Sequence, residues 1–184
     1  MIEAELKARV REPDALRKRL CRLADEERST YRDTYYVRPG GDLAADGREL
    51  RVRVIEAGEL RRTVLTYKEP AVDADSGSKP EHETNVADAD TIDTVFRALG
   101  LQHLVAFEKR CANYRFTAHG RDMLATVVTV PEIDGTFIEL ETMADEADVG
   151  AALDDLRVVL HELGINDDDL TTEQYTDAVM NARG

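Results

Sequence analysis

Residues 2–10 read Ile-Glu-Ala-Glu-Leu-Lys-Ala-Arg-Val, with apolar side chains at every even position and charged side chains at every odd one. A period of two is that of a β-strand with two unlike faces. The charged face carries the carboxylates of Glu3 and Glu5 beside the cations of Lys7 and Arg9. Carboxylates bind hard divalent metals and cations bind phosphates, so this face suits a site for both. The competing interpretation is an exposed edge strand with mixed charges, and the other strands decide between the two.

The same alternation recurs in five further segments, each with a group of charged side chains on one face. They are residues 48–54 with Arg51 and Arg53, 61–68 with Lys68, 79–85 with Lys79, Glu81 and Glu83, 105–116 with Lys109 and Arg115, and 137–141 with Glu139 and Glu141. So many charges are costly to bury unless they are paired, solvated or neutralised by a ligand. The pattern therefore predicts an α+β fold, in which strands form a barrel around a polar ligand and helices cover its apolar outer face.

Helices are predicted for residues 13–27, 88–99 and 147–163, and a last one near Thr171, with Thr171 and Gln174 as a capping box. Their apolar stripes are expected to face the core. Residues 72–79 are predicted to form a polar connector between two strands.

The composition limits the function classes. The chain has 184 residues, which suits one domain. Its net charge of −14 means that it lacks the excess of positive charge that nucleic-acid-binding proteins use to bind phosphates. No apolar stretch predicts a membrane helix, and no signal peptide precedes the first strand, so a cytoplasmic location is expected. Arginine far outnumbers lysine among the cations, which fits a halophilic source; an acidic surface kept soluble by self-repulsion is the alternative. Cys21 and Cys111 lack the spacing of a zinc site.

The motifs together resemble the CYTH domain family, also called the triphosphate tunnel metalloenzymes. Glu3-Ala4-Glu5-Leu6-Lys7 matches its ExExK signature, which is specific only because the basic and acidic strands above follow it in the family's order. The resemblance covers residues 2 to about 175 and is strongest to the class IV adenylyl cyclases, with thiamine and inorganic triphosphatases as relatives. It implies a single CYTH domain over residues 1–184, folded as an antiparallel eight-stranded tunnel.

The resemblance also implies roles for particular residues. Glu3, Glu5, Glu139 and Glu141 would bind Mg²⁺ or Mn²⁺, and Glu3, Glu5 and Lys7 would be catalytic. The implied substrate-binding residues are Lys7, Arg51, Arg53, Lys68, Lys79, Glu81, Glu83, Lys109 and Arg115. The expected reaction converts ATP to cyclic AMP and pyrophosphate. Hydrolysis of inorganic or thiamine triphosphate, or triphosphate binding without turnover, are the alternatives, and a homodimer is compatible with the family.

Two positions depart from the family pattern. Where the family has an arginine two residues after Lys109, this chain has Cys111; Arg110 would need a β-bulge to reach that face, and Arg115 is the candidate substitute. The aspartate expected on the penultimate tunnel strand falls on Val128 or Thr129. The missing acidic group would weaken a metal site or alter the substrate that is turned over.

Overall fold

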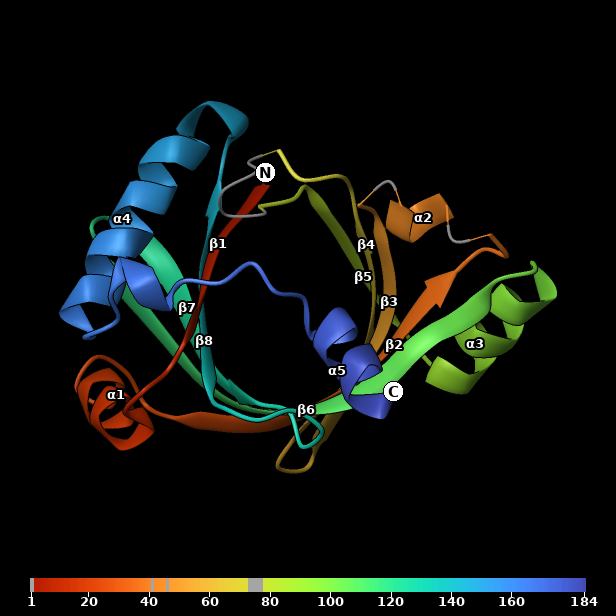
Figure 1. Ribbon diagram of the computed structural model, residues 1–184, viewed down its shortest axis with the longest axis horizontal. Coiled ribbons are helices and arrows are strands. Elements are labelled where there is room, and N and C mark those ends of the chain that lie inside the picture. The colour runs from red at the N-terminus through yellow and green to blue at the C-terminus, as the bar shows by residue number, and fades with distance from the viewer. Residues whose placement is uncertain (1, 41, 46, 73–77) are drawn as a thin grey trace.

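A computed structural model describes residues 2–40, 42–45, 47–72 and 78–184, and its centre is one antiparallel sheet of eight strands (Figure 1). The strands are β1 (Ile2–Arg9), β2 (Glu27–Val37), β3 (Glu49–Ala57), β4 (Leu60–Lys68), β5 (Glu81–Val86), β6 (Gln102–Ala118), β7 (Arg121–Thr129) and β8 (Phe137–Ala144). Their order is β1-β8-β7-β6-β2-β3-β4-β5. The sheet curls into a half barrel whose edges meet at an isolated bridge between Glu3 and Lys79. The predicted α+β fold with eight antiparallel strands is confirmed.

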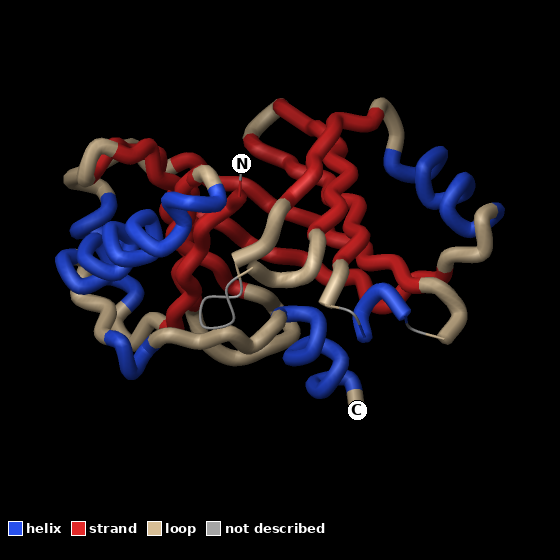
Figure 2. Tube along the Cα trace, turned by 90° about the horizontal axis from the view of Figure 1, so that it is seen from above, coloured by secondary structure: helices blue, strands red, loops and turns tan. Residues whose placement is uncertain are grey.

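Among the described residues, five α-helices accompany the sheet: α1 (Pro13–Leu20), α2 (Asp42–Ala45), α3 (Ala89–Ala98), α4 (Val149–Glu162) and α5 (Tyr175–Arg183). Figures 1 and 2 show α1, α3 and α4 outside the curled sheet, as predicted. Helix α5 differs, because the chain after α4 crosses the opening of the half barrel and brings α5 to its inner side (Figure 1). Within the described part of the chain, no helix combines the length and apolarity needed to cross a bilayer.

The main core lies between the outer face of the sheet and the helices α1 and α4. The even-numbered residues of β1, including Ala4, Leu6 and Ala8, are almost completely buried there. Leu16 and Leu20 of α1 and Leu156 of α4 fill the same cluster. Burial of this face of β1 forces the odd-numbered, charged residues onto the inner face.

Two helices differ from their predicted extents. Helix α1 ends at Leu20, not at residue 27, because the amides of Arg22 and Leu23 bond to carbonyls three residues back and close a tight turn. The turn leaves Leu23 half exposed, and β2 begins at Glu27. Helix α5 begins at Tyr175, and the predicted capping box is absent because Gln174, the N-cap, makes no side-chain capping bond.

The prediction that every amphipathic stripe faces the core is wrong for α3. Asp88 caps this helix by accepting a bond from the Thr91 amide, as expected, yet none of its residues is buried. The helix contacts the sheet through the ring of Phe96, which packs edge-on against Tyr36 with centroids 5.0 Å apart. Of the predicted connector 72–79, residues 73–77 lie outside the described residues.

Candidate functional site

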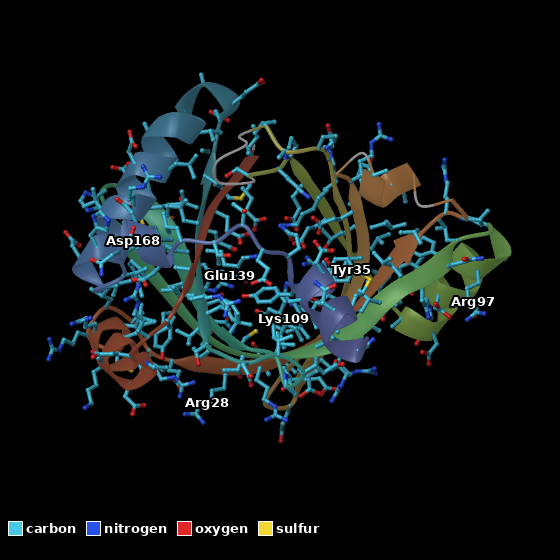
Figure 3. All side chains as sticks on the ribbon, in the orientation of Figure 1. Arg28, Tyr35, Arg97, Lys109, Glu139 and Asp168 are labelled. Carbon is cyan, nitrogen blue, oxygen red and sulfur yellow. The ribbon has the colours of Figure 1, made fainter. Side chains whose placement is uncertain are left out.

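The inner face of the curled sheet encloses a cavity of about 350 Å³, within the range of small-molecule sites. Figure 3 shows Glu139, Lys109 and Tyr35 directed into this space, whereas Arg28, Arg97 and Asp168 lie outside it. Every site residue predicted from the sequence lines this one cavity: Glu3, Glu5, Lys7, Arg51, Arg53, Lys68, Lys79, Glu81, Glu83, Lys109, Arg115, Glu139 and Glu141.

Three carboxylates converge on one side of the cavity. One oxygen from each of Glu3, Glu5 and Glu141 lies within 4.8 Å of the others, because β1 and β8 pair with Glu5 opposite Glu141. Burial, together with repulsion from Glu139, raises the pKa of Glu5 to about 6, and burial with repulsion from Glu3 and Glu5 raises that of Glu141 well above its ordinary value. The three carboxylates bring several oxygen donors together, and their negative charges repel one another. Such a set fits Mg²⁺ or Mn²⁺, which would neutralise these charges.

Glu139 does not belong to this group of three. It faces the ammonium of Lys109, whose Nζ lies 3.3 Å from its Oε1. Burial alone would raise the pKa of Glu139, but attraction to Lys109 and Lys7 outweighs it and lowers the pKa. Glu139 therefore holds its charge against cations, and its role as a metal ligand stays a prediction.

A network of cations and carboxylates adjoins the three converging carboxylates and shares Glu3 with them. Lys68 Nζ, from β4, lies 2.9 Å from Glu3 on the edge strand β1 and 2.5 Å from Glu81 on the edge strand β5. This one ammonium group therefore links the two edges of the sheet. Arg51 donates to the hydroxyl of Thr66 at 3.1 Å and lies 3.6 Å from both Glu81 and Glu83.

Two further predicted cations, Lys79 and Arg115, also line the cavity. Lys79 pairs with Glu49 at 2.5 Å. Arg115 lines the cavity but is exposed to solvent.

Asp33, which the sequence analysis missed, does not line the cavity but binds Arg53, which does. Arg53 donates to both of its carboxylate oxygens at 2.7 Å, and Asp33 is 1% exposed. Burial alone would raise the pKa of Asp33, but the charge and hydrogen bonds of Arg53 lower it to about 2. The other face of the guanidinium lies 4.5 Å from the ring centroid of Tyr31. Arg53 is thus held in one orientation with its charge directed along the cavity wall.

The C-terminal segment also contributes residues that sequence reasoning missed. Thr171, Thr172, Gln174, Tyr175 and Thr176 line the cavity. Lys7 donates to the backbone carbonyl of Glu173, and the Thr171 amide donates to the carbonyl of Lys7 at 2.9 Å. The ring of Tyr175 lies beneath two ammonium groups, 4.7 Å from that of Lys7 and 4.1 Å from that of Lys109.

The two departures from the family pattern are neighbours in space. Cys111 on β6 pairs directly with Val128 on β7, and both are buried in one apolar cluster on the inner face. Burial raises the pKa of the Cys111 thiol to about 12, which excludes it as a nucleophile at neutral pH. Arg110 pairs with Glu108 instead, and the β6–β7 ladder runs from Arg110 to Ala118 without a bulge, so Arg110 does not replace the arginine.

Comparison with known proteins agrees with this geometry. The family model of the CYTH domain matches residues 1–175. Adenylate cyclase CyaB of Aeromonas hydrophila is 29% identical over 182 residues, which cover 94% of this chain and 86% of CyaB. The PH1819 protein of Pyrococcus horikoshii OT3 has a similar structure, with a TM-score of 0.83, 22% identity and 99% of each chain covered.

A second solved structure is that of HpAC1 from Hippeastrum, a candidate adenylyl cyclase described as revealing a dominant triphosphatase activity. Its TM-score is 0.67 at 19% identity, with 98% of this chain and 96% of HpAC1 covered. At these identities the two solved structures support the fold, whereas the family model spans nearly all of the sequence. The protein described here therefore belongs to the CYTH domain family.

Proposed function

We propose that this protein is a metal-dependent enzyme that binds a triphosphate in the cavity and cleaves it, with ATP as substrate and cyclic AMP and pyrophosphate as products. The observation that carries the proposal is the division of one cavity into two kinds of surface. Three converging carboxylates, Glu3, Glu5 and Glu141, stand beside the cations Lys7 and Lys109. A metal–polyphosphate complex is the ligand class that uses both kinds of surface at once.

The roles follow from the contacts. Glu3, Glu5 and Glu141 would hold Mg²⁺ or Mn²⁺, and a bound ion there would draw electron density from phosphate oxygens. Lys7, Arg51, Arg53, Lys68 and Lys109 would bind and orient the triphosphate by charge-assisted hydrogen bonds. Asp33 would hold Arg53, and Glu139 would hold Lys109, in position to contact the phosphates of the substrate.

In the cyclase reaction, the ribose 3′-oxygen forms a bond to the α-phosphorus and its proton is released to water. The bond from the α-phosphorus to the bridging oxygen breaks, and pyrophosphate leaves with that electron pair. The cations named above would stabilise the charge that develops on the leaving pyrophosphate.

Hydrolysis of a triphosphate is the second candidate, and the aromatic side chains of the cavity favour it. The ring of Tyr31 lies against Arg53, that of Tyr35 stacks on Phe107 at 5.8 Å, and that of Tyr175 lies under two lysines. Each of these tyrosine rings is therefore already engaged, which leaves little stacking surface for a purine among them. The described triphosphatase activity of HpAC1 agrees with this alternative.

The test is product analysis by chromatography after incubation with ATP, inorganic triphosphate or thiamine triphosphate, with Mg²⁺ or Mn²⁺ and at low and molar salt. Cyclic AMP with an equal amount of pyrophosphate supports the cyclase. Release of orthophosphate without cyclic AMP would show that the protein hydrolyses the triphosphate. Absence of turnover from a folded protein that binds triphosphate would leave a binding protein and refute the enzyme.

The control variants separate the site from general stability. Glu141→Gln removes one carboxylate of the converging group and should abolish metal-dependent turnover. Glu162→Gln changes an exposed glutamate at the end of α4 and should leave turnover unchanged.

A further inference from the structure

A further hollow, of about 490 Å³, lies on the outer face of the sheet beside α1. Three of the residues that line it are arginines, Arg17, Arg28 and Arg110, and one is a glutamate, Glu56. Figure 3 shows Arg28 on the outer side of the sheet, away from the cavity described above. In a chain with a net charge of −14, this hollow therefore concentrates positive charge.

The strand register brings two of the arginines together. Antiparallel pairing of β2 with β6 places Arg28 opposite Ala112 and Thr30 opposite Arg110. Arg28 and Arg110 are therefore diagonal neighbours on one face, about 7–8 Å apart, a separation that long side chains can span. The small side chain of Ala112, which also lines the hollow, leaves the space between them unfilled.

Arg17 reaches the same hollow from α1, and its guanidinium lacks a partner. Leu16 and Leu20 anchor this helix in the core, which places Arg17 at the edge of the hollow. Its Nε is buried and makes no hydrogen bond to any described residue. A buried charged donor is costly unless an acceptor completes it, and a guanidinium can only donate. An anion in the hollow would supply that acceptor.

The carboxylates beside the other two arginines leave donors free. Arg28 donates from Nε to Glu26 at 2.6 Å, and Arg110 donates from Nε to Glu108 at 3.4 Å. The two arginine side chains are 77% and 67% exposed, so each pair contributes little. A guanidinium has five N–H donors, and those on the terminal nitrogens of both arginines are available to a ligand.

The same carboxylates limit the size of the ligand. Glu26 and Glu108 adjoin the arginines, and Glu56 lines the hollow itself. A long polyanion such as a nucleic acid would extend over these carboxylates and be repelled, whereas a small anion would contact the arginines alone. Phosphate oxygens match the paired donors of guanidinium groups in geometry as well as charge.

We propose that this outer hollow is a binding site for a small free phosphate-type anion, either inorganic phosphate or pyrophosphate, held by Arg17, Arg28 and Arg110. The site is separate from the cavity, because Arg110 and its neighbour Lys109 point to opposite faces of β6. The inference therefore does not rest on the proposed function.

The test follows the arginine Nε–H signals of nitrogen-15-labelled protein by NMR during titration with phosphate and, separately, with pyrophosphate in metal-free buffer. Triple-resonance spectra assign the signals, and loss of one signal in Arg17→Lys confirms that of Arg17. The Arg17 signal should shift and saturate below about 10 mM of at least one of the two anions, and the anion that saturates it at lower concentration is the better ligand. Sodium chloride at matched ionic strength should leave the signal in place.

The double variant Arg28→Gln/Arg110→Gln keeps the reporter and removes two of the three cations. The concentration that gives half of the Arg17 shift should rise at least about tenfold, because charged hydrogen bonds to the anion are lost. The signal of Arg53, which lines the cavity, should respond as in the unmodified protein. Both substituted side chains are largely exposed, so the variant should fold.

Arg22→Gln/Arg97→Gln is the matched control, since it removes the same charge from two exposed arginines outside the hollow. It should leave the half-saturating concentration unchanged. The inference would be overturned by an Arg17 signal that does not shift, that shifts equally with chloride, or that responds alike in the two double variants. A response of Arg17 without one of Arg53 would support this site while counting against binding of the same anion in the cavity.

Discussion

Two arginine–carboxylate pairs join β2 to β3 at the same distance, and burial alone should make their contributions to stability very different. Arg53 contacts Asp33 at 2.7 Å with side chains 15% and 0% exposed. Arg32 contacts Glu56 at 2.7 Å with side chains 52% and 37% exposed. Asp33→Ala leaves a buried guanidinium without its partner, which costs about 3–5 kcal/mol, whereas Glu56→Ala removes an exposed pair that contributes at most about 1 kcal/mol.

For a chain of this length, about 1 kcal/mol shifts the melting temperature by roughly 2–4 °C. Asp33→Ala should therefore lower it by about 6–20 °C and Glu56→Ala by less than about 4 °C. Urea unfolding followed by circular dichroism gives the free energies, provided that the slope against urea concentration stays constant among the variants.

The double variant Asp33→Ala/Arg53→Leu separates loss of the pair from exposure of its surviving charge. It should be more stable than Asp33→Ala alone, because it leaves no buried unpaired cation. Equal costs for Asp33→Ala and Glu56→Ala would refute the reasoning, and so would a double variant that is no more stable than Asp33→Ala alone.

Three further predictions concern other parts of the molecule. Burial raises the pKa of Glu5 from its ordinary 4.5 to about 6, so the folded protein binds more protons than the unfolded chain around and between these values. Lowering the pH from 7 to 5 should therefore stabilise this site by about 1 kcal/mol without metal. Saturating Mg²⁺ should abolish that gain, and calorimetric titration of Mn²⁺ should show weaker binding at pH 5.5 than at pH 8; affinity independent of pH would contradict the carboxylate site. Only the exposed Cys21 should react rapidly with a thiol reagent at pH 8, because Cys111 is buried. Rapid reaction of two thiols per molecule of folded protein would be inconsistent with the place of Cys111 in the apolar cluster. Leu16→Ala in α1 should cost about 2–5 kcal/mol in urea unfolding, whereas Val95→Ala in α3, at a site 43% exposed, should cost less than about 1 kcal/mol; similar costs would show that α3 packs more tightly than its exposure indicates.

The sequence predicted which side chains share the cavity because of the pleat of a strand. Alternation at Glu3, Glu5 and Lys7 fixes which side chains share a face, and one buried face then fixes where the other must point. The helices on the outer face complete this argument, since α1 and α4 bury Ala4 and Leu6. The residues identified in this way line one cavity, as expected.

What the sequence did not reveal depends on contacts between distant parts of the chain. Strand β2 carries polar or aromatic residues on both faces, so Asp33 has no periodic signal, and its burial depends on pairing with Arg53. Tyr175 reaches the cavity because the chain returns across the half barrel after α4, which no local pattern specifies. Helix α3 shows the reverse error, because its strong apolar stripe lies over the sheet without being buried.

The pairing of β1 with β8 sets the order in which the molecule can be completed during synthesis. Glu5 meets Glu141 only after almost the whole sequence between them has emerged from the ribosome, and Tyr175 comes later still. The first strand must therefore wait while β2 to β7 form their hairpins, and contacts of such long sequence separation form slowly. A nascent chain that stops before β8 lacks Glu141, so a partial product cannot assemble the three carboxylates and sequester the metal or the nucleotide in the cell.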